Sequence, residues 1–247
     1  MPDTIIIETK DLTCIYDGSH NGVFDINLCV SKGEFIIVAG KNGSGKTTLF
    51  RLFNALLTPS SGKVFVHGKD SVKHPVLARK TTGMVFQDAD MQIVGETVYD
   101  DTAFGPENLK LPRREINYRV ETALKKIGLF HLKDRNPSTL SGGEKRRLAL
   151  AGVLSMDPEV IVFDEPFANL DYPGSLDLLS CIRDIHASGQ TIIIAIHDIE
   201  KVISFATRMI IMDNGKIVHD NIPAALLDKL KRYGIRQPAN NGIVPWL

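Results

Sequence analysis

A glycine-rich stretch at residues 40–48, GKNGSGKTT, has the residue types needed to hold a polyphosphate. Its glycines allow the backbone to wrap around phosphate groups, so that several N–H groups point inward at the start of a helix. Lys46 would add a positive charge beside the terminal phosphates, and the hydroxyl of Thr47 would coordinate Mg²⁺. Because the apolar run EFIIVAG comes directly before it, a phosphate-binding loop is favoured over a chance glycine-rich turn.

Two carboxylates, Asp164 and Glu165, end the apolar run VIVFDE. A carboxylate at the end of a buried strand suits Mg²⁺, which predicts that Asp164 is the second metal ligand. Glu165 would then act on a water molecule, as a general base or as an orienting group. The alternative is an ordinary acidic turn before Pro166, and the phosphate-binding pattern in the same chain favours the catalytic interpretation.

A second glycine motif, SGGE at residues 141–144, raises the question of why one chain has two. Ser141 followed by Glu144 is the pattern of a capping box at the start of a helix. That pattern does not explain Gly142 and Gly143, each of which weakens a first helical turn by up to ~1 kcal/mol. Glycines at a helix start are useful where another molecule must approach the backbone closely, which predicts a second anion site.

The chain around these motifs alternates strands with helices, which predicts an α/β fold with a mostly parallel sheet and some antiparallel strands. All-apolar runs such as EFIIVAG are typical of parallel strands that are buried on both faces. The Asn214-Gly215 pair predicts a two-residue hairpin turn. The expected strands lie at about 24–30, 34–40, 62–69, 81–87, 160–165 and 191–198, with the hairpin at 208–220.

Helices are expected from Lys46, from about Arg113, from Ser141 and near 174–187. The second of these has apolar residues on one face at helical spacing, and Gly128 would end it. That apolar face consists of Ile116, Val120, Leu124 and Ile127. We expect a single domain over 1–247, with a core at about 1–87 and 156–225, a helical insertion at about 88–155 and a short C-terminal tail at about 226–247.

Composition narrows the class of protein. The 247 residues include 29 Lys and Arg and 29 Asp and Glu, so the net charge is 0 and there is no global basic signal for nucleic acid. The three cysteines are scattered, without metal-binding spacing, as in proteins of a reducing compartment. No apolar run approaches the ~18 residues of a membrane span, and no signal peptide is evident.

The motifs GKNGSGKTT, LSGGEKRRLALA, VIVFDEPFANLD and IIIAIHD, in this order, resemble those of the ATPase subunit of an ABC transporter over about residues 4–225. The resemblance implies the phosphate-loop NTPase fold of that family, with ATP and Mg²⁺ bound. It also implies a dimer in which each subunit's signature loop, here 140–144, caps the ATP of the other. The nucleotide would be held by Tyr16, Gly40, Lys41, Asn42, Gly43, Ser44, Gly45, Lys46, Thr47 and Thr48.

The same resemblance assigns roles to four further residues, each with a plainer alternative. Gln87 would contact Mg²⁺ or water, or simply be a polar strand end. His197 resembles the switch histidine at the γ-phosphate, and Asp171 the aspartate of the D-loop at the dimer interface, which is also a helix N-cap pattern. Tyr16 resembles the aromatic residue that stacks on adenine, although a tyrosine at a strand edge often only packs.

The stretch VFQDADMQIVGETVYDDTAFGPENLKL, residues 85–111, resembles the corresponding segment of energy-coupling factor (ECF) importers, with Ala89 in place of the usual proline. This resemblance implies import of a transition metal ion (cobalt or nickel) or a vitamin. It implies an identical or paralogous ATPase partner, a transmembrane coupling protein that docks near Gln87, and a separate membrane protein that captures the substrate. The chain would lie at the cytoplasmic face of the cell membrane.

Three alternatives stay open at this stage. The chain would be the ATPase of another importer branch, a soluble ABC ATPase acting on nucleic acid or ribosomes, or a different phosphate-loop kinase or GTPase. The second class usually has tandem ATPase domains, coiled-coil insertions or zinc sites, none of which the sequence suggests. The third is disfavoured by LSGGE and by the lack of a recognisable guanine-specificity motif.

Overall fold

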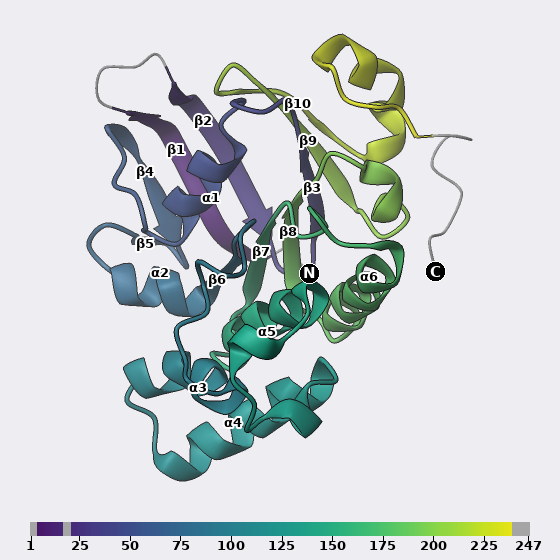
Figure 1. The fold of residues 1–247 in the computed structure, drawn as a ribbon. Helices are drawn as coiled ribbons and strands as arrows, with labels where there is room; N and C mark the ends of the chain where they lie inside the picture. Colours follow the sequence, from purple (N-terminus) through teal and green to yellow (C-terminus); the bar gives the residue numbers. More distant parts are fainter. Residues whose placement is uncertain (1–3, 17–20, 239–247) are drawn as a thin grey trace.

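Six strands form a largely parallel sheet at the centre of the molecule, in the order β10-β9-β3-β8-β7-β6 (Figure 1). The structure is a computed structural model that describes residues 4–16 and 21–238. β3 pairs in parallel with β8 and β9, and β10 pairs antiparallel with β9. The strands are β3 (Phe35–Ala39), β6 (Thr82–Val85), β7 (Val160–Asp164), β8 (Thr191–Ala195), β9 (Arg208–Asp213) and β10 (Lys216–Asn221).

A second, antiparallel sheet has the strand order β2-β1-β4-β5. It lies beside the parallel sheet, with α1 (Lys46–Phe53) between the two (Figure 1). The expected strand at 24–30 is the middle of the longer β2. The strands of this sheet are β1 (Ile5–Ile15), β2 (Gly22–Ser31), β4 (Ser61–Val66) and β5 (Lys69–Asp70).

The apolar strands of the parallel sheet are buried on both faces, as their composition predicts. Along β3, Phe35 and Ile37 belong to one hydrophobic cluster and Ile36 and Val38 to another. Successive side chains of a strand point to opposite faces, so one strand contributes to two cores. The first cluster lies under the helices of the 98–187 region, and the second contains α1 and the antiparallel sheet.

The remaining helices cover one face and one end of the parallel sheet (Figure 1). The four apolar residues expected on one face of α4 are all buried, and Gly128, with φ +73°, follows the end of this helix as predicted. Short 3₁₀ segments connect several elements. The helices are α2 (Pro75–Thr81), α3 (Val98–Asn108), α4 (Arg113–Lys126), α5 (Gly142–Leu154) and α6 (Tyr172–Ala187).

The C-terminal part of the described chain packs onto the same core. A 3₁₀ segment, η5 (Leu227–Tyr233), buries Leu230, and Leu226 and Ile235 flank it in the first cluster. The part of the expected tail at 239–247 lies outside the described residues. The boundaries expected for core, insertion and tail remain a prediction.

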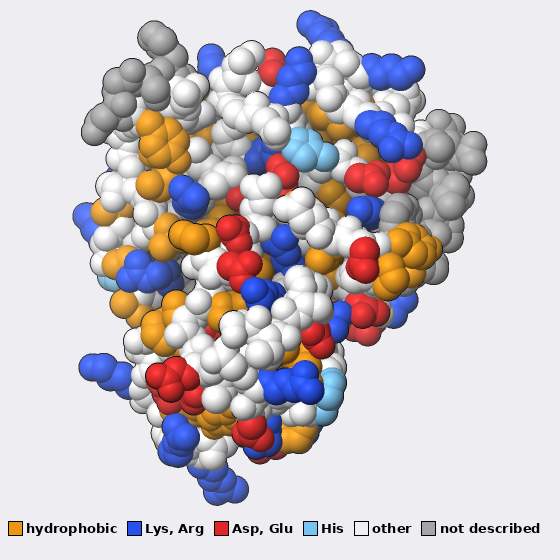
Figure 2. Space-filling view, viewed as in Figure 1, with side chains coloured by type: hydrophobic (Ala, Val, Ile, Leu, Met, Phe, Trp, Pro, Cys, Tyr) orange, Lys and Arg blue, Asp and Glu red, His pale blue; other side chains and the backbone are white. Residues whose placement is uncertain are grey.

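On the face shown in Figure 2, positive and negative side chains are interspersed, and no extended basic patch is visible. On that face, the mixture of basic and acidic side chains agrees with their equal numbers in the sequence. No helix in the described part of the chain combines the length and apolar character that a membrane crossing requires.

Candidate nucleotide-binding and catalytic site

The glycine-rich loop joins the end of β3 to the start of α1, as predicted. Gly45 is the N-cap of α1 with φ +102°, a left-handed conformation that favours glycine, and no side chain in the described part of the chain caps this helix end. The first N–H groups of α1 therefore remain available for an anion. A Cβ at Gly40 would lie 2.5 Å from the carbonyl oxygen of Met212, so only glycine allows the loop to approach β9 this closely.

Two buried polar side chains of the loop are suited to bind phosphate. The ammonium group of Lys46, which is 6% exposed, donates to the carbonyl oxygens of Gly40 (2.8 Å) and Lys41 (3.0 Å). Burial lowers the pKa of Lys46, and the carboxylates of Glu165 and Asp164 oppose that shift. Within the described residues, the buried Oγ of Ser44 has no hydrogen-bond partner. An unpaired donor and a cation at a helix start fit a polyphosphate.

Thr47 and Asp164, two of the three predicted metal ligands, are brought together. The Thr47 hydroxyl donates to Oδ2 of Asp164 at 2.7 Å. Burial raises the pKa of Asp164, and the hydrogen bond from Thr47 partly offsets this. A hydroxyl and a carboxylate beside a phosphate site are ligands that suit Mg²⁺, which usually completes its shell with phosphate oxygens and water.

Glu165 lies between the two other predicted catalytic side chains. Its Oε1 is 2.9 Å from Nε2 of His197, and its Oε2 accepts a hydrogen bond of 3.4 Å from Nε2 of Gln87. The Glu165 side chain is 17% exposed, so water can reach it. The structure therefore places a carboxylate, an imidazole and an amide together at the edge of the phosphate-binding loop.

A cleft of about 470 Å³ is lined by the phosphate-binding loop together with Gln87 and Glu165. It extends from Tyr16, whose hydroxyl lies 3.1 Å from Oγ1 of Thr48, past the loop to Gln87 and Glu165. Asn21 and Gly22 also line it, and no sequence pattern predicted either of them as a site residue. The adenine contact predicted for Tyr16 remains a prediction.

The second glycine motif forms the capping box that its spacing predicted. The Ser141 hydroxyl accepts from the Glu144 N–H at 3.3 Å, and a Glu144 carboxylate oxygen accepts from the Ser141 N–H at 2.7 Å. This second bond is the main reason why the pKa of Glu144 is lowered. Among the described residues, a Cβ at Gly142 would meet nothing within 4 Å. The capping box needs no glycine there, so the open backbone remains available to an outside ligand.

The two glycine motifs do not share a cleft within one chain. Among the described residues, the lining of the phosphate-loop cleft includes none of 140–144. Asp171 caps α6 by accepting from the Gly174 N–H at 2.9 Å. The alternative role considered for it, a helix N-cap, is therefore present. Its role at a dimer interface remains a prediction.

Three polar residues that contact the backbone of residues 86–95 were missed by sequence reasoning. Arg146 donates to backbone carbonyls of the Gln87 strand end, and Gln92 accepts from the Phe86 N–H at 3.1 Å. Asp101 is 7% exposed and accepts from the N–H groups of residues 94 and 95 at 2.7 and 3.0 Å. The only signal in the sequence was a charged or amide residue within an otherwise apolar helix face or turn, which does not identify a partner.

Comparison with known proteins places the chain in a family. The sequence model of the ABC transporter family matches residues 23–168, more than half of the chain. The chain is 42% identical to "Energy-coupling factor transporter ATP-binding protein EcfA" of Methanocaldococcus jannaschii, over 94% of this chain and 86% of that protein. It is 47% identical to "Energy-coupling factor transporter ATP-binding protein EcfA1" of Caldanaerobacter subterraneus subsp. tengcongensis, over 87% and 79%.

A further relative is longer than this chain. The chain is 41% identical to a "Putative ABC transporter ATP-binding protein" of Methanosarcina mazei and spans only 53% of that protein's length. Among solved structures, cbiO1 from Clostridium perfringens, described as part of the ABC transporter complex cbiONQ, superposes with a TM-score of 0.81 at 37% identity, covering 96% of this chain and 97% of that one. The chain therefore belongs to the ABC transporter family, among the ATP-binding proteins of energy-coupling factor transporters.

Proposed function

We propose that this chain is the ATP-hydrolysing subunit that energises an importer of the ECF type. The observation that carries the proposal is the position of Glu165, between Gln87 and His197 at the edge of the phosphate-loop cleft. A carboxylate held by two polar groups beside a phosphate site has the geometry of a general base for water. The relatives named for energy-coupling factor transporters support the same function.

Each residue of the site has a definite task in this proposal. The N–H groups at the start of α1, Ser44 and Lys46 bind the phosphates of ATP, and Lys46 exchanges its two carbonyl partners for phosphate oxygens. Thr47, Asp164 and Gln87 would hold Mg²⁺, which supplies neutralising charge on the phosphates. Glu165 accepts a proton from the attacking water, and His197 donates toward the γ-phosphate.

The second glycine motif belongs, in this proposal, to the ATP site of another chain. Ser141 and the open backbone at Gly142 and Gly143 would form an anion site separate from the chain's own cleft, whose described lining includes none of these residues. Two chains related by a two-fold axis would then complete two equivalent sites. The partner chain is identical or paralogous, and Asp171 would lie at the interface.

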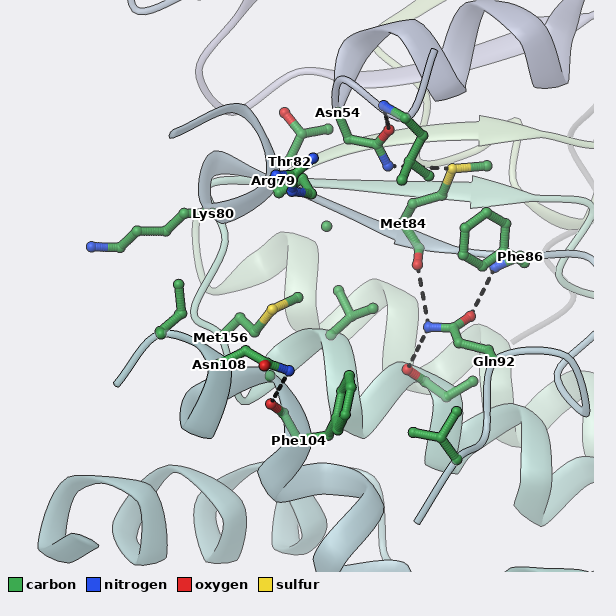
Figure 3. A pocket seen from close by; sticks show the side chains of 18 of the residues that line it. Asn54, Arg79, Lys80, Thr82, Met84, Phe86, Gln92, Phe104, Asn108 and Met156 are labelled. Carbon is green, nitrogen blue, oxygen red and sulfur yellow. Dashed lines mark hydrogen bonds between the residues drawn. The ribbon is translucent and has the colours of Figure 1, made fainter. Parts of the chain in front are cut away.

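A groove near Gln87 provides a docking site for the transmembrane coupling protein (Figure 3). It has a volume of about 550 Å³ and extends from Asn54 and Met84 to Phe104 and Met156. Large apolar side chains are exposed along it, including Phe104 (55%). Phe86, which directly precedes Gln87, lines the same groove, so an occupant would contact the segment that carries Gln87. We assign the groove to a short helix of that membrane protein.

The transported substrate would be bound by a separate membrane protein. A transition metal ion such as cobalt or nickel, or a vitamin, remains the prediction that the ECF resemblance gives. The described residues contain no group of three or more His, Cys, Asp or Glu side chains that could hold a metal ion. The chain would then act at the cytoplasmic face of the cell membrane, bound through the coupling protein.

A pull-down of the tagged full chain from detergent-solubilised membranes tests this proposal. We expect a transmembrane coupling protein and a small multi-helix membrane protein, with ATP hydrolysis in the purified complex. A pair of conventional permeases would place the chain in another importer branch. Nucleic acid or ribosomes without a membrane partner would overturn the transport function and leave only ATP hydrolysis.

A further inference from the structure

Arg146 joins three parts of the chain that have separate tasks in the proposed reaction. It lies on α5, two residues after Glu144, and is 6% exposed. Its Nη1 donates to the carbonyl oxygens of Phe86 (3.2 Å) and Gln87, and its Nη2 donates to that of Ala168 (2.9 Å), in the segment between Glu165 and Asp171. One guanidinium group thus connects α5 with the two segments that contribute Gln87 and Glu165 to the lining of the phosphate-loop cleft.

Two neighbouring contacts strengthen the same connection. Lys145 forms an ion pair with Asp90 at 2.6 Å. The amide of Gln92 donates to the carbonyl oxygens of Met84 (3.3 Å) and Ala149 (3.4 Å), the latter on α5 (Figure 3). The segment 84–92, which we call the Gln87 segment, is therefore attached to α5 at three places.

These contacts lie on α5 within one turn or two of the signature loop. A helix is stiff over such a distance, so a displacement of the Gln87 segment that acts on Arg146 also displaces the start of α5. Arginine suits this task because its planar group presents several donors in a fixed arrangement. Burial lowers the pKa of Arg146, while Asp88 and Asp90 oppose that shift.

We propose that Arg146 is a positioning residue that transmits the movement of Gln87 at the chain's own ATP to the signature loop that serves the ATP of the second chain. The inference rests on the proposed function, because it takes the two sites to be those of an ATPase dimer. It adds a physical link between them inside one chain. Arg146 itself touches neither nucleotide.

Hydrogen exchange of the full chain, with and without ATP and Mg²⁺, tests this link. The chain is diluted until size-exclusion chromatography shows single chains, so that a second chain cannot cause the effects. In the wild type, we expect ATP to slow exchange in the Gln87 segment and in residues 141–146. In Arg146→Gln, we expect ATP still to slow exchange in the Gln87 segment, and its effect on residues 141–146 to shrink about tenfold.

Arg119→Gln is the matched control. Arg119 also donates to a backbone carbonyl, that of Met156 at 3.3 Å, but neither of its hydrogen-bond partners, Glu115 and Met156, belongs to the Gln87 segment. We expect this variant to retain both effects. The inference would be overturned if ATP still slowed exchange at 141–146 in Arg146→Gln. It would also be overturned if ATP bound to the wild type without slowing exchange at 141–146. A wild type that binds no fluorescent ATP analogue would instead count against the proposed function.

If Arg146→Gln does not fold, a charge exchange in the Lys145–Asp90 ion pair tests the same link. Lys145→Glu places two carboxylates together at Asp90 and should weaken the effect at 141–146, and addition of Asp90→Lys should restore it. Loss without restoration in the double variant would contradict the link.

In the assembled transporter, Arg146→Gln should lower kcat for ATP about tenfold and leave KM unchanged. A parallel rise in KM would instead indicate a damaged nucleotide site and contradict the proposal.

Discussion

Glu165 has a backbone conformation that few residues with a side chain adopt. Its φ is +50°, in the left-handed region, and its N–H donates to the carbonyl oxygen of Ala195 at 3.0 Å. Such a conformation costs of order 1 kcal/mol and persists where neighbouring contacts enforce it. The turn directs the carboxylate out of the buried strand β7 toward Gln87 and His197. Strain at this position is consistent with a catalytic role.

Glu165→Gln should stop hydrolysis without preventing nucleotide binding. Glutamine has the same shape and can keep the contact with Gln87, but it cannot accept a proton from water. We expect kcat to fall about 100-fold or more, with ATP affinity unchanged. Steady-state phosphate release and equilibrium binding of a fluorescent ATP analogue measure the two quantities.

Glu159→Gln is the control, since Glu159 precedes the same strand at its other end and pairs with His67 at the surface. It should leave turnover intact. Normal turnover in Glu165→Gln would remove the general-base role.

Asp164→Asn should raise the stability of the nucleotide-free protein at neutral pH while abolishing its catalytic activity. The folded-state pKa of Asp164 is raised by burial, so the ionised form lowers the free energy of unfolding above that pKa. We therefore expect the variant to melt at a higher temperature than the nucleotide-free wild type at neutral pH. The difference should narrow as the pH falls toward the raised pKa, where the wild-type carboxyl also becomes neutral.

Melting curves at several pH values measure this effect, and Mg²⁺-dependent turnover should be lost in the same variant. A lower melting temperature at neutral pH would mean that the hydrogen bond from Thr47 outweighs the burial of charge.

At the scale of the element, the start of α5 combines a capping box with two glycines that the cap does not require. A Cβ at Gly143 would meet only the Cα of Gly174, at 3.8 Å, which is an ordinary contact. Gly143→Asp should therefore fold with nearly the wild-type melting temperature. Its carboxylate would repel the phosphates of the second chain's ATP, so that the ATP-dependent dimer and turnover are lost.

Size-exclusion chromatography of Gly143→Asp in the Glu165→Gln background measures the dimer directly. Ser141→Ala is the comparison for stability. Loss of its N-cap side chain should lower the free energy of unfolding by about 1 kcal/mol, whereas Gly143→Asp should leave it nearly unchanged. A dimer that forms normally with Gly143→Asp would show that the glycine motif serves only the fold.

The elements that local patterns could predict are those with a strong period or a strong turn signal. The fully buried strands β3, β7 and β8, the apolar face of α4 and the Asn214-Gly215 hairpin between β9 and β10 are all present. Likewise, the ordered motifs predicted that Thr47 meets Asp164. The contacts of Arg146 and Gln92 could not be predicted, because they join residues about 60 positions apart and depend on which backbone carbonyls the fold leaves unpaired.

At the scale of the molecule, the groove of Figure 3 should be required for assembly but not for nucleotide binding. Phe104→Glu places a charge among its exposed apolar side chains and should abolish co-purification of the transmembrane coupling protein. ATP affinity of the isolated chain should stay the same.

The matched control is Tyr118→Glu, on α4, since Tyr118 is 68% exposed and does not line this groove. It should retain the membrane partner. Equal recovery of the partner with both variants would contradict this use of the groove.

The strand order of the parallel sheet also limits when the protein can become active during its synthesis. β3 and the phosphate-binding loop are made early, but their sheet neighbours β8 and β9 occupy residues 191–213. A growing chain on the ribosome therefore has the apolar strand β3 without either neighbour until residues 191–213 have been made. ATP can then bind only after β8 and β9 have been synthesised, and chains that terminate before them would expose β3 to chaperones and proteases.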